Sequence, residues 1–187
     1  ASDKQAQAVK NLEEAKKKLE KLLQQMREEE IERVLAALEA RCQKMLAMQQ
    51  QVLAGTIDVD ARAATRPGKK ANADDKKDAL KLADQEKEIV QEVNKCIDIL
   101  ESEGSAVAFP EVFQQIRQDM IHVQKRLELT DVHDVTQNIE RDIIETLKEM
   151  IDALKKAQEE NQESKSGKSK PGKQGKQGDQ KLLELLQ

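Results

Sequence analysis

The sequence predicts an all-α protein: an elongated antiparallel helical bundle or coiled coil, with one long N-terminal helix and about three shorter helices. Two observations predict this fold. Residues 3–54 contain neither Gly nor Pro and consist mostly of strong helix formers. The 187-residue chain also has two Phe and no Trp or Tyr. Its core must therefore be aliphatic, which suits narrow seams between helices.

The long first helix is predicted over residues 1–54, with Gly55 ending it. Its apolar residues follow coiled-coil spacing in two stretches, and the acidic run Glu28–Glu30 separates them, so the stripe is expected to shift there as at a stutter. The first stretch consists of Leu12, Leu19, Leu22, Leu23 and Met26. The second contains Ile31, Leu35, Leu38, Cys42, Met45 and Val52.

Residues 55–73 are predicted to be a linker, because Gly55, Pro67 and Gly68 fall within them. The alternating stretch Thr56–Asp60 looks like a strand, but five residues without a partner strand cannot form a sheet. We therefore expect a loop.

Residues 74–163 are predicted to form three further helices that pack on the first. The first of these runs from Asp74 to Glu103, and its apolar stripe, which continues around Glu86, is wide enough to contact more than one helix. Gly104 is expected to end it.

The next helix is predicted from Pro110 to Leu129, with Phe109 and Phe113 placed like a hydrophobic staple at its start. These two Phe are expected to fill one end of the bundle. The capping residues Thr130, Asp131 and Asp134 indicate a break or a kink before the last helix, Val135–Glu160, and a continuous helix through them stays open as the alternative.

Residues 164–181 are rich in Lys, Gly and Gln, which predicts a disordered linker. Binding of an anionic polymer through its lysines is an alternative function for this segment. Residues 182–187 contain four Leu and are expected to begin a helix that continues past residue 187. Gly167–Ser169 match the end of a phosphate-binding loop, but the first glycine of that motif would fall at Gln162, which argues against nucleotide binding.

Cys42 and Cys96 are the only cysteines, and each lies within a helical pattern. Their spacing fits neither a disulfide framework nor a metal knuckle, so we interpret them as small apolar residues on packed helices. A disulfide between them stays open as an alternative if the chain is exported.

A metal-binding or enzymatic bundle is the second functional hypothesis, with Asp119, His122 and His133 as ligands. The pattern for such a site is incomplete, because no Glu-x-x-His sequence occurs. Neither a nucleophile elbow nor another catalytic arrangement is present. The sequence thus predicts no catalytic residue, cofactor or small-molecule substrate.

The charge balance and the apolar pattern bear on partners. With 36 acidic and 32 basic residues, the net charge of −4 argues against a surface dedicated to nucleic acid. No apolar run approaches the length of a membrane span.

The combination of the long Gln, Glu and Lys-rich helix, the Lys-rich linker and the final Leu cluster resembles segments of uncharacterised, exported bacterial coiled-coil proteins. The resemblance is compositional and rests on no diagnostic motif. It implies a fragment of a larger cell-envelope protein, and it favours an exported or periplasmic location over the cytoplasm. With Ala rather than Met at position 1, we expect a processed or excised chain.

The first functional hypothesis is a structural or scaffolding module that acts through helix-on-helix contacts with protein partners or by self-association. The first helix is much longer than its expected neighbours, so part of its apolar stripe must lie uncovered or contact a partner. The residues expected to form this surface are Leu12, Leu19, Leu22, Leu23 and Met26.

Overall fold

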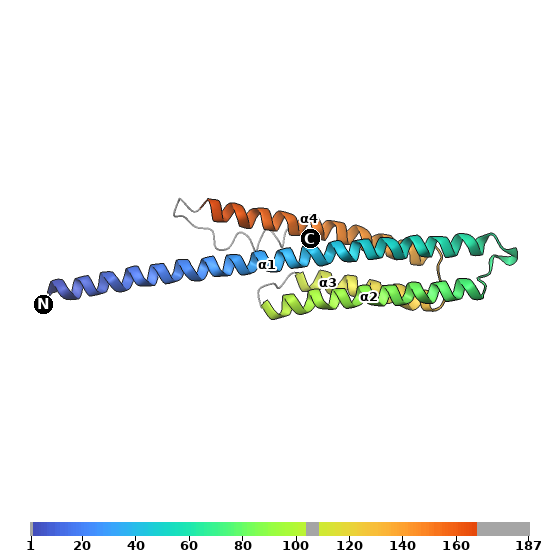
Figure 1. Cartoon of the computed structure of the whole chain (residues 1–187), viewed down its shortest axis with the longest axis horizontal. Helices are drawn as coiled ribbons and strands as arrows, with labels where there is room; N and C mark the ends of the chain where they lie inside the picture. Colours follow the sequence, from blue (N-terminus) through green and yellow to red (C-terminus); the bar gives the residue numbers. More distant parts are fainter. Residues whose placement is uncertain (1, 104–108, 168–187) are drawn as a thin grey trace.

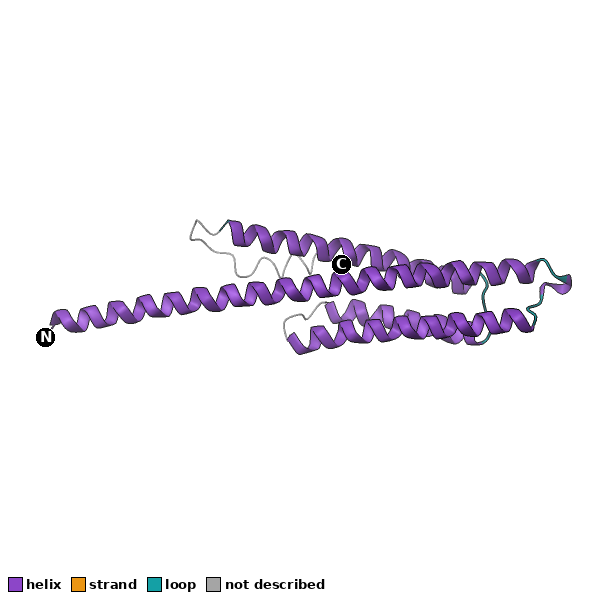
Figure 2. Cartoon of the chain, viewed as in Figure 1, coloured by secondary structure: helices purple, strands orange, loops and turns teal. Residues whose placement is uncertain are grey.

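The computed structural model describes residues 2–103 and 109–167, and within these ranges it confirms an all-α helical bundle without strands (Figure 2). The α-helices are α1 (Ser2–Ala64), α2 (Ala73–Glu103), α3 (Phe109–Glu128) and α4 (Asp134–Ser166). A short 3-10 helix, η1 (Pro67–Lys69), lies in the turn between α1 and α2.

The helices surround one core, because α1 contacts α2 and α4, and α3 contacts the same two helices from the other side (Figure 1). Along α1 and α2 the polar contacts run in opposite order. Arg41 Nη1 lies 3.0 Å from Glu92 Oε2, whereas Arg62 Nη2 lies 2.7 Å from Asp78 Oδ2. Residue numbers that rise on one helix and fall on the other show that α1 and α2 run in opposite directions.

Contacts between α1 and α4 follow the same opposite order. Thr56 Oγ1 donates to Glu140 Oε1 at 2.8 Å, and Asn161 Nδ2 donates to the backbone oxygen of Glu28 at 3.2 Å. Helix α1 therefore runs in the opposite direction to both α2 and α4.

The core side of α1 is an uninterrupted heptad stripe. From Leu35 to Ala63 a buried residue recurs every three or four positions, which is the spacing of one helix face packed between neighbours. These residues are Leu35, Leu38, Cys42, Met45, Gln49, Val52, Thr56, Val59 and Ala63.

The predicted end of the first helix at Gly55 is wrong, and residues 55–64 of the predicted linker are helical. Gly55 lies inside α1, where Leu82 of α2 packs directly against it. A Cβ added at Gly55 would lie 2.5 Å from Leu82 Cδ2. Glycine thus permits a close helix contact here instead of ending the helix, and residues 65–72 form the actual connection.

Gly55→Leu is expected to lower the free energy of unfolding by about 2 kcal/mol, because a side chain at this position must push Leu82 and α2 away. Ala54→Leu is the matched control, since Ala54 is exposed on the same helical turn. Urea unfolding followed by circular dichroism measures both. Equal midpoints for the two variants would contradict the close contact.

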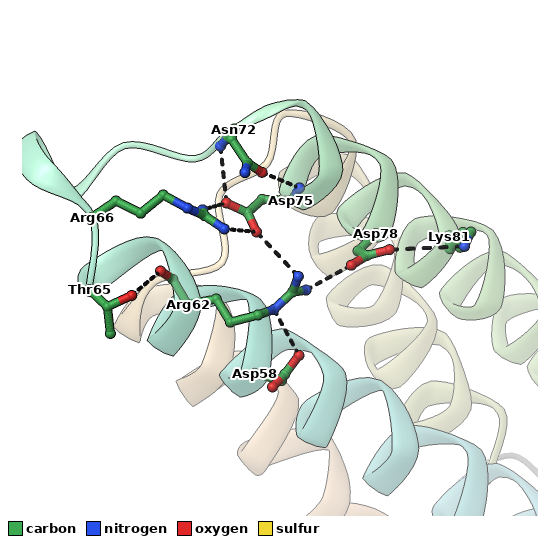
Figure 3. Close-up of polar contacts among 8 residues, drawn as sticks. All are labelled: Asp58, Arg62, Thr65, Arg66, Asn72, Asp75, Asp78 and Lys81. Atoms are coloured by element: carbon green, nitrogen blue, oxygen red, sulfur yellow. Dashed lines mark hydrogen bonds and ion pairs between the residues drawn. The ribbon is translucent and has the colours of Figure 1, made fainter.

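A polar cluster fastens the turn between α1 and α2 (Figure 3). The backbone N–H of Asp75 donates to Asn72 Oδ1 at 2.9 Å, and the backbone N–H of Asn72 donates to Asp75 Oδ2 at 3.0 Å. This reciprocal pair caps the start of α2. The Arg66 guanidinium binds the buried Asp75 carboxylate, and Arg62 Nη1 lies 3.5 Å from Asp75 Oδ1. One carboxylate in the first turn of α2 thereby binds Arg62 in the last turn of α1 and Arg66 just beyond its end.

Asp75→Ala is expected to lower the urea midpoint clearly more than Asp74→Ala, whose side chain is exposed on the same turn. The hydrogen bond from Arg66 and the backbone N–H of Asn72 lower the pKa of Asp75. A carboxylate with a lowered pKa contributes stability that is present above its unfolded pKa and is lost as the pH falls. The difference in urea midpoint between the native chain and Asp75→Ala should therefore shrink below about pH 4. A difference that stays constant with pH would contradict a stabilising role of the Asp75 carboxylate.

The other helix boundaries agree only in part with those predicted from the sequence. The break between the last two helices is confirmed, with Thr130 in the left-handed region at φ 59°. Phe113 is fully buried, as expected, while the side chain of Phe109 lies outside the described residues. The predicted end of the last helix at Glu160 is wrong.

The predicted disorder of residues 164–181 is also wrong for residues 164–166. Helix α4 continues to Ser166, and Lys165 in its last turn forms an ion pair with Glu32 of α1. This contact holds the end of α4 on α1. The rest of the predicted linker and the Leu-rich residues 182–187 lie outside the described residues.

Candidate functional site

The N-terminal part of α1 projects beyond the other three helices (Figure 1). Every side chain from Asp3 to Arg27 is exposed, and the hydrogen bond from Asn161 reaches α1 at Glu28. At about 1.5 Å per residue, the projecting segment is roughly 38 Å long. Because α1 is one continuous helix, this segment extends from the bundle along the axis of α1.

The projecting segment carries the residues that the sequence predicts as an interaction surface, and no other described part of the chain covers them. Its large apolar side chains are between 53% and 70% exposed. We call this set the α1 stripe: Val9, Leu12, Leu19, Leu22, Leu23 and Met26. Val9 is the member that the sequence prediction missed, although its position three residues before Leu12 continues the heptad spacing.

The α1 stripe lies on a different face of α1 from the residues that enter the bundle core. At about 100° per residue, Leu19–Met26 point on average roughly 140° away from the core-facing side chains of residues 31–42. The sequence predicted a shift near Glu28–Glu30, and the burial pattern changes there from exposed to buried residues. A helix bound to the α1 stripe would therefore approach from a side that α2 and α4 do not occupy.

Charged side chains border the α1 stripe. Lys16 falls within the heptad pattern, and its Nζ lies 4.0 Å from Glu20 Oε1 one turn later. Glu13 and Arg27 follow Leu12 and Met26 directly and are also exposed. An apolar seam with a charged border is the usual form of a coiled-coil surface.

The core of the bundle contains a buried polar layer contributed by three helices. Gln49 Nε2 of α1 donates to Glu86 Oε2 of α2 at 2.9 Å, and Thr56 Oγ1 of α1 donates to Glu140 Oε1 of α4 at 2.8 Å. All four side chains are fully buried. Within the described residues, the second carboxyl oxygen of each glutamate has no hydrogen-bond partner.

Burial shifts the ionisation of both glutamates. It raises the pKa of Glu86 to about 8, where the hydrogen bond from Gln49 acts in the opposite direction and Glu140 adds to the increase. It also raises the pKa of Glu140 to about 7, against the hydrogen bond from Thr56. Both carboxyl groups are therefore largely protonated at slightly acidic pH, which avoids two negative charges in an apolar interior.

Glu92 of α2 shows the contrasting solution for a buried carboxylate. Burial alone would raise its pKa, but hydrogen bonds from Lys44 and Lys95 outweigh that effect and lower the pKa to about 2. Arg41 Nη1 also lies 3.0 Å from its Oε2. Glu92 thus stays charged and joins α1 to α2 at the edge of the core.

The proposed metal ligands are not brought together. His133, before the first turn of α4, is exposed and lies 2.7 Å from Asp60 Oδ1 of α1 through its Nδ1. His122 is exposed on α3, and Asp119 Oδ1 accepts a hydrogen bond from Gln115 at 3.2 Å. In the part of the chain that the structure describes, no three His, Cys, Asp or Glu residues are grouped to hold a metal ion.

Cys42 of α1 and Cys96 of α2 are both fully buried free thiols. Burial raises the pKa of Cys42, and Cys96 adds to that increase. Burial also raises the pKa of Cys96, to about 12. The two residues therefore pack as small apolar groups, as the sequence suggested.

Comparison with known proteins gives no family assignment: no family model, no curated protein and no solved structure matches the chain. Over residues 2–103 and 109–167, no helix is both long and apolar enough to cross a membrane. The lysines proposed to bind an anionic polymer lie mostly outside these ranges. The α1 stripe is accordingly the candidate site on which a functional proposal can be built.

Glu86→Gln is expected to remove much of the pH dependence of stability. A carboxyl group whose pKa is raised on folding contributes its full stabilisation of the folded state at a pH below its pKa in the unfolded chain. This contribution is lost as the pH rises from about 4.5 to about 8. The glutamine variant should match the native chain near pH 4.5 and exceed it by several kcal/mol near pH 8. Urea unfolding between these pH values measures the difference.

Glu88→Gln is the control for this experiment, because Glu88 is exposed on the same helix. It should leave the slope of stability against pH unchanged. Parallel curves for the native chain and Glu86→Gln would show that Glu86 is not held neutral by the core.

Proposed function

We propose that this chain is a non-enzymatic structural or protein-interaction module that binds a partner helix along the α1 stripe. The observation that carries the proposal is the exposure of six large apolar side chains, 53–70% each, on a helix that projects from a packed bundle. Contiguous apolar surface with a charged border is typical of protein interaction sites.

The pattern of the α1 stripe favours a helix as the partner. Its members recur at heptad spacing, so they form a row of knobs that fits the holes on another helix. A groove for an extended peptide would need neighbouring elements on both sides, whereas no other described helix lies beside the projecting segment of α1 (Figure 1).

The bundle supports this role because it is packed without the side chains of the projecting segment. Its core lies between residues 35 and 63 of α1 and the other three helices, and the projecting segment contributes no buried side chain to it. A partner could therefore bind or leave the α1 stripe without disturbing the packing of the bundle.

Site-specific photo-crosslinking tests the proposed surface without assuming the identity of the partner. A photoreactive residue in place of Leu19 should give covalent adducts in the native host or in purified solution. The same residue in place of Lys17, which is exposed on the opposite face of α1, should give few. Equal yields from the two positions, or none from either, would contradict a role for the α1 stripe.

A further inference from the structure

The length of the α1 stripe restricts what can cover it. From Val9 to Met26 the stripe extends for roughly 26 Å at about 1.5 Å per residue, so a single covering helix needs at least about 18 residues. The projecting segment of α1 in a second copy has both the required length and a matching heptad pattern.

The heptad positions of the stripe are self-complementary when two copies run in opposite directions. Antiparallel helices place the first core position, a, of one chain opposite the second, d, of the other. The a positions are Val9, Lys16 and Leu23, and the d positions are Leu12, Leu19 and Met26. Val9 then faces Met26, Leu12 faces Leu23, and Lys16 faces Leu19, each twice in the dimer. Every layer thus contains at least one large apolar residue.

The charges beside the core match the same arrangement. In antiparallel coiled coils the e positions of the two helices face each other, and here they are Glu13, Glu20 and Arg27. Glu13 of one copy meets Arg27 of the other at both ends of the contact. Near the twofold axis the two Glu20 carboxylates approach each other, and each already has Lys16 of its own chain 4.0 Å away.

The other side of the seam is narrow and uncharged. Its g positions are Ala8, Ala15 and Leu22. Ala15 of the two copies would meet at the centre, and Ala8 would meet Leu22 at each end. Small side chains at the centre let the two helices approach closely, while Leu22 extends the apolar contact.

A parallel arrangement in register lacks these matches. It would place Lys16 beside Lys16 in the core of the seam, and it would bring Arg27 next to the apolar Leu22 rather than to Glu13. At about 100° per residue, the a and d positions of the seam point on average roughly 100° away from the core-facing side chains of residues 31–42, so each bundle leaves room for the other helix.

We propose that a second copy of this chain docks antiparallel on the α1 stripe and pairs Glu13 of each copy with Arg27 of the other. This inference rests on the proposed function of the stripe and names its partner. The assembly would be an extended dimer with one bundle at each end and a two-helix coiled coil between them.

Sedimentation of the full chain, from sub-micromolar to high-micromolar concentration, tests the dimer. A monomer–dimer equilibrium is expected. Leu19→Asp should raise the dimer dissociation constant at least about 100-fold, because each dimer loses two buried leucines. Lys17→Asp, on the opposite face, should leave the dissociation constant nearly unchanged. A monomer at all concentrations, or equal effects of both substitutions, would overturn the proposal.

Charge exchange tests the orientation. At low salt, Glu13→Arg and Arg27→Glu should each weaken the homodimer roughly tenfold, because each places like charges at both ends of the contact. Mixing the two variants should restore association at least to the native strength, since every end again pairs Glu with Arg. A mixture that associates no better than the separate variants would exclude the antiparallel register.

A chain lacking residues 168–187 tests the remaining alternative, in which the chain's own C-terminal residues cover the α1 stripe. If the chain's own C-terminal residues covered the stripe, the full chain would be monomeric and the shortened chain would associate, which would overturn the proposal. If the chain is monomeric in both forms, while position 19 crosslinks to a different protein, the proposed function stands and only the second copy fails.

Discussion

The rest of the structure depends on one constraint: α1 is a single continuous helix whose apolar stripe changes face near Glu28. A continuous helix cannot rotate one half against the other, so neighbours that cover residues 35–63 cannot also cover Val9–Met26. Helices α2 and α4 pack on the first of these faces. No other described part of the chain covers the other face over the projecting segment. One half of the helix thus stabilises the bundle, and the other half carries the surface that we propose binds a partner.

Within the bundle, polar groups fix how the helices align. A purely aliphatic seam would tolerate sliding by one heptad, because Leu, Ile and Val layers resemble one another. The pairs Gln49–Glu86 and Thr56–Glu140 form only in one alignment of α1 with α2 and α4. Sliding would leave these buried polar groups without partners, at a cost of roughly 1–3 kcal/mol per group. The layer thus adds specificity to a core that hydrophobic burial stabilises.

The sequence was sufficient for the features that depend on local pattern. Helix content, the break near Thr130, the shift near Glu28 and the uncovered residues of the α1 stripe all follow from spacing and residue type. Gly55 was misread because a lone glycine can end a helix or admit a close neighbour. The difference is set by Leu82, which lies on another helix. The buried polar layer was only weakly indicated by the sequence: Gln49, Glu86 and Glu140 are polar residues at heptad positions. Their pairing depends on the alignment of three helices.

The separation of the two halves also links association to the order of the projecting segment. Residues 3–27 have no buried contact with the bundle, so their helix depends on its own backbone hydrogen bonds and on strong helix formers such as Ala, Leu, Glu and Lys. In proteins most helical stability comes from packing of an apolar face against neighbours, and this segment has no such packing within the described residues. A bound helix would bury apolar side chains on both partners and thereby stabilise the helical state of each. Binding and ordering of this segment are then one coupled equilibrium, while the bundle beyond Glu28 keeps its structure whether or not the partner is bound.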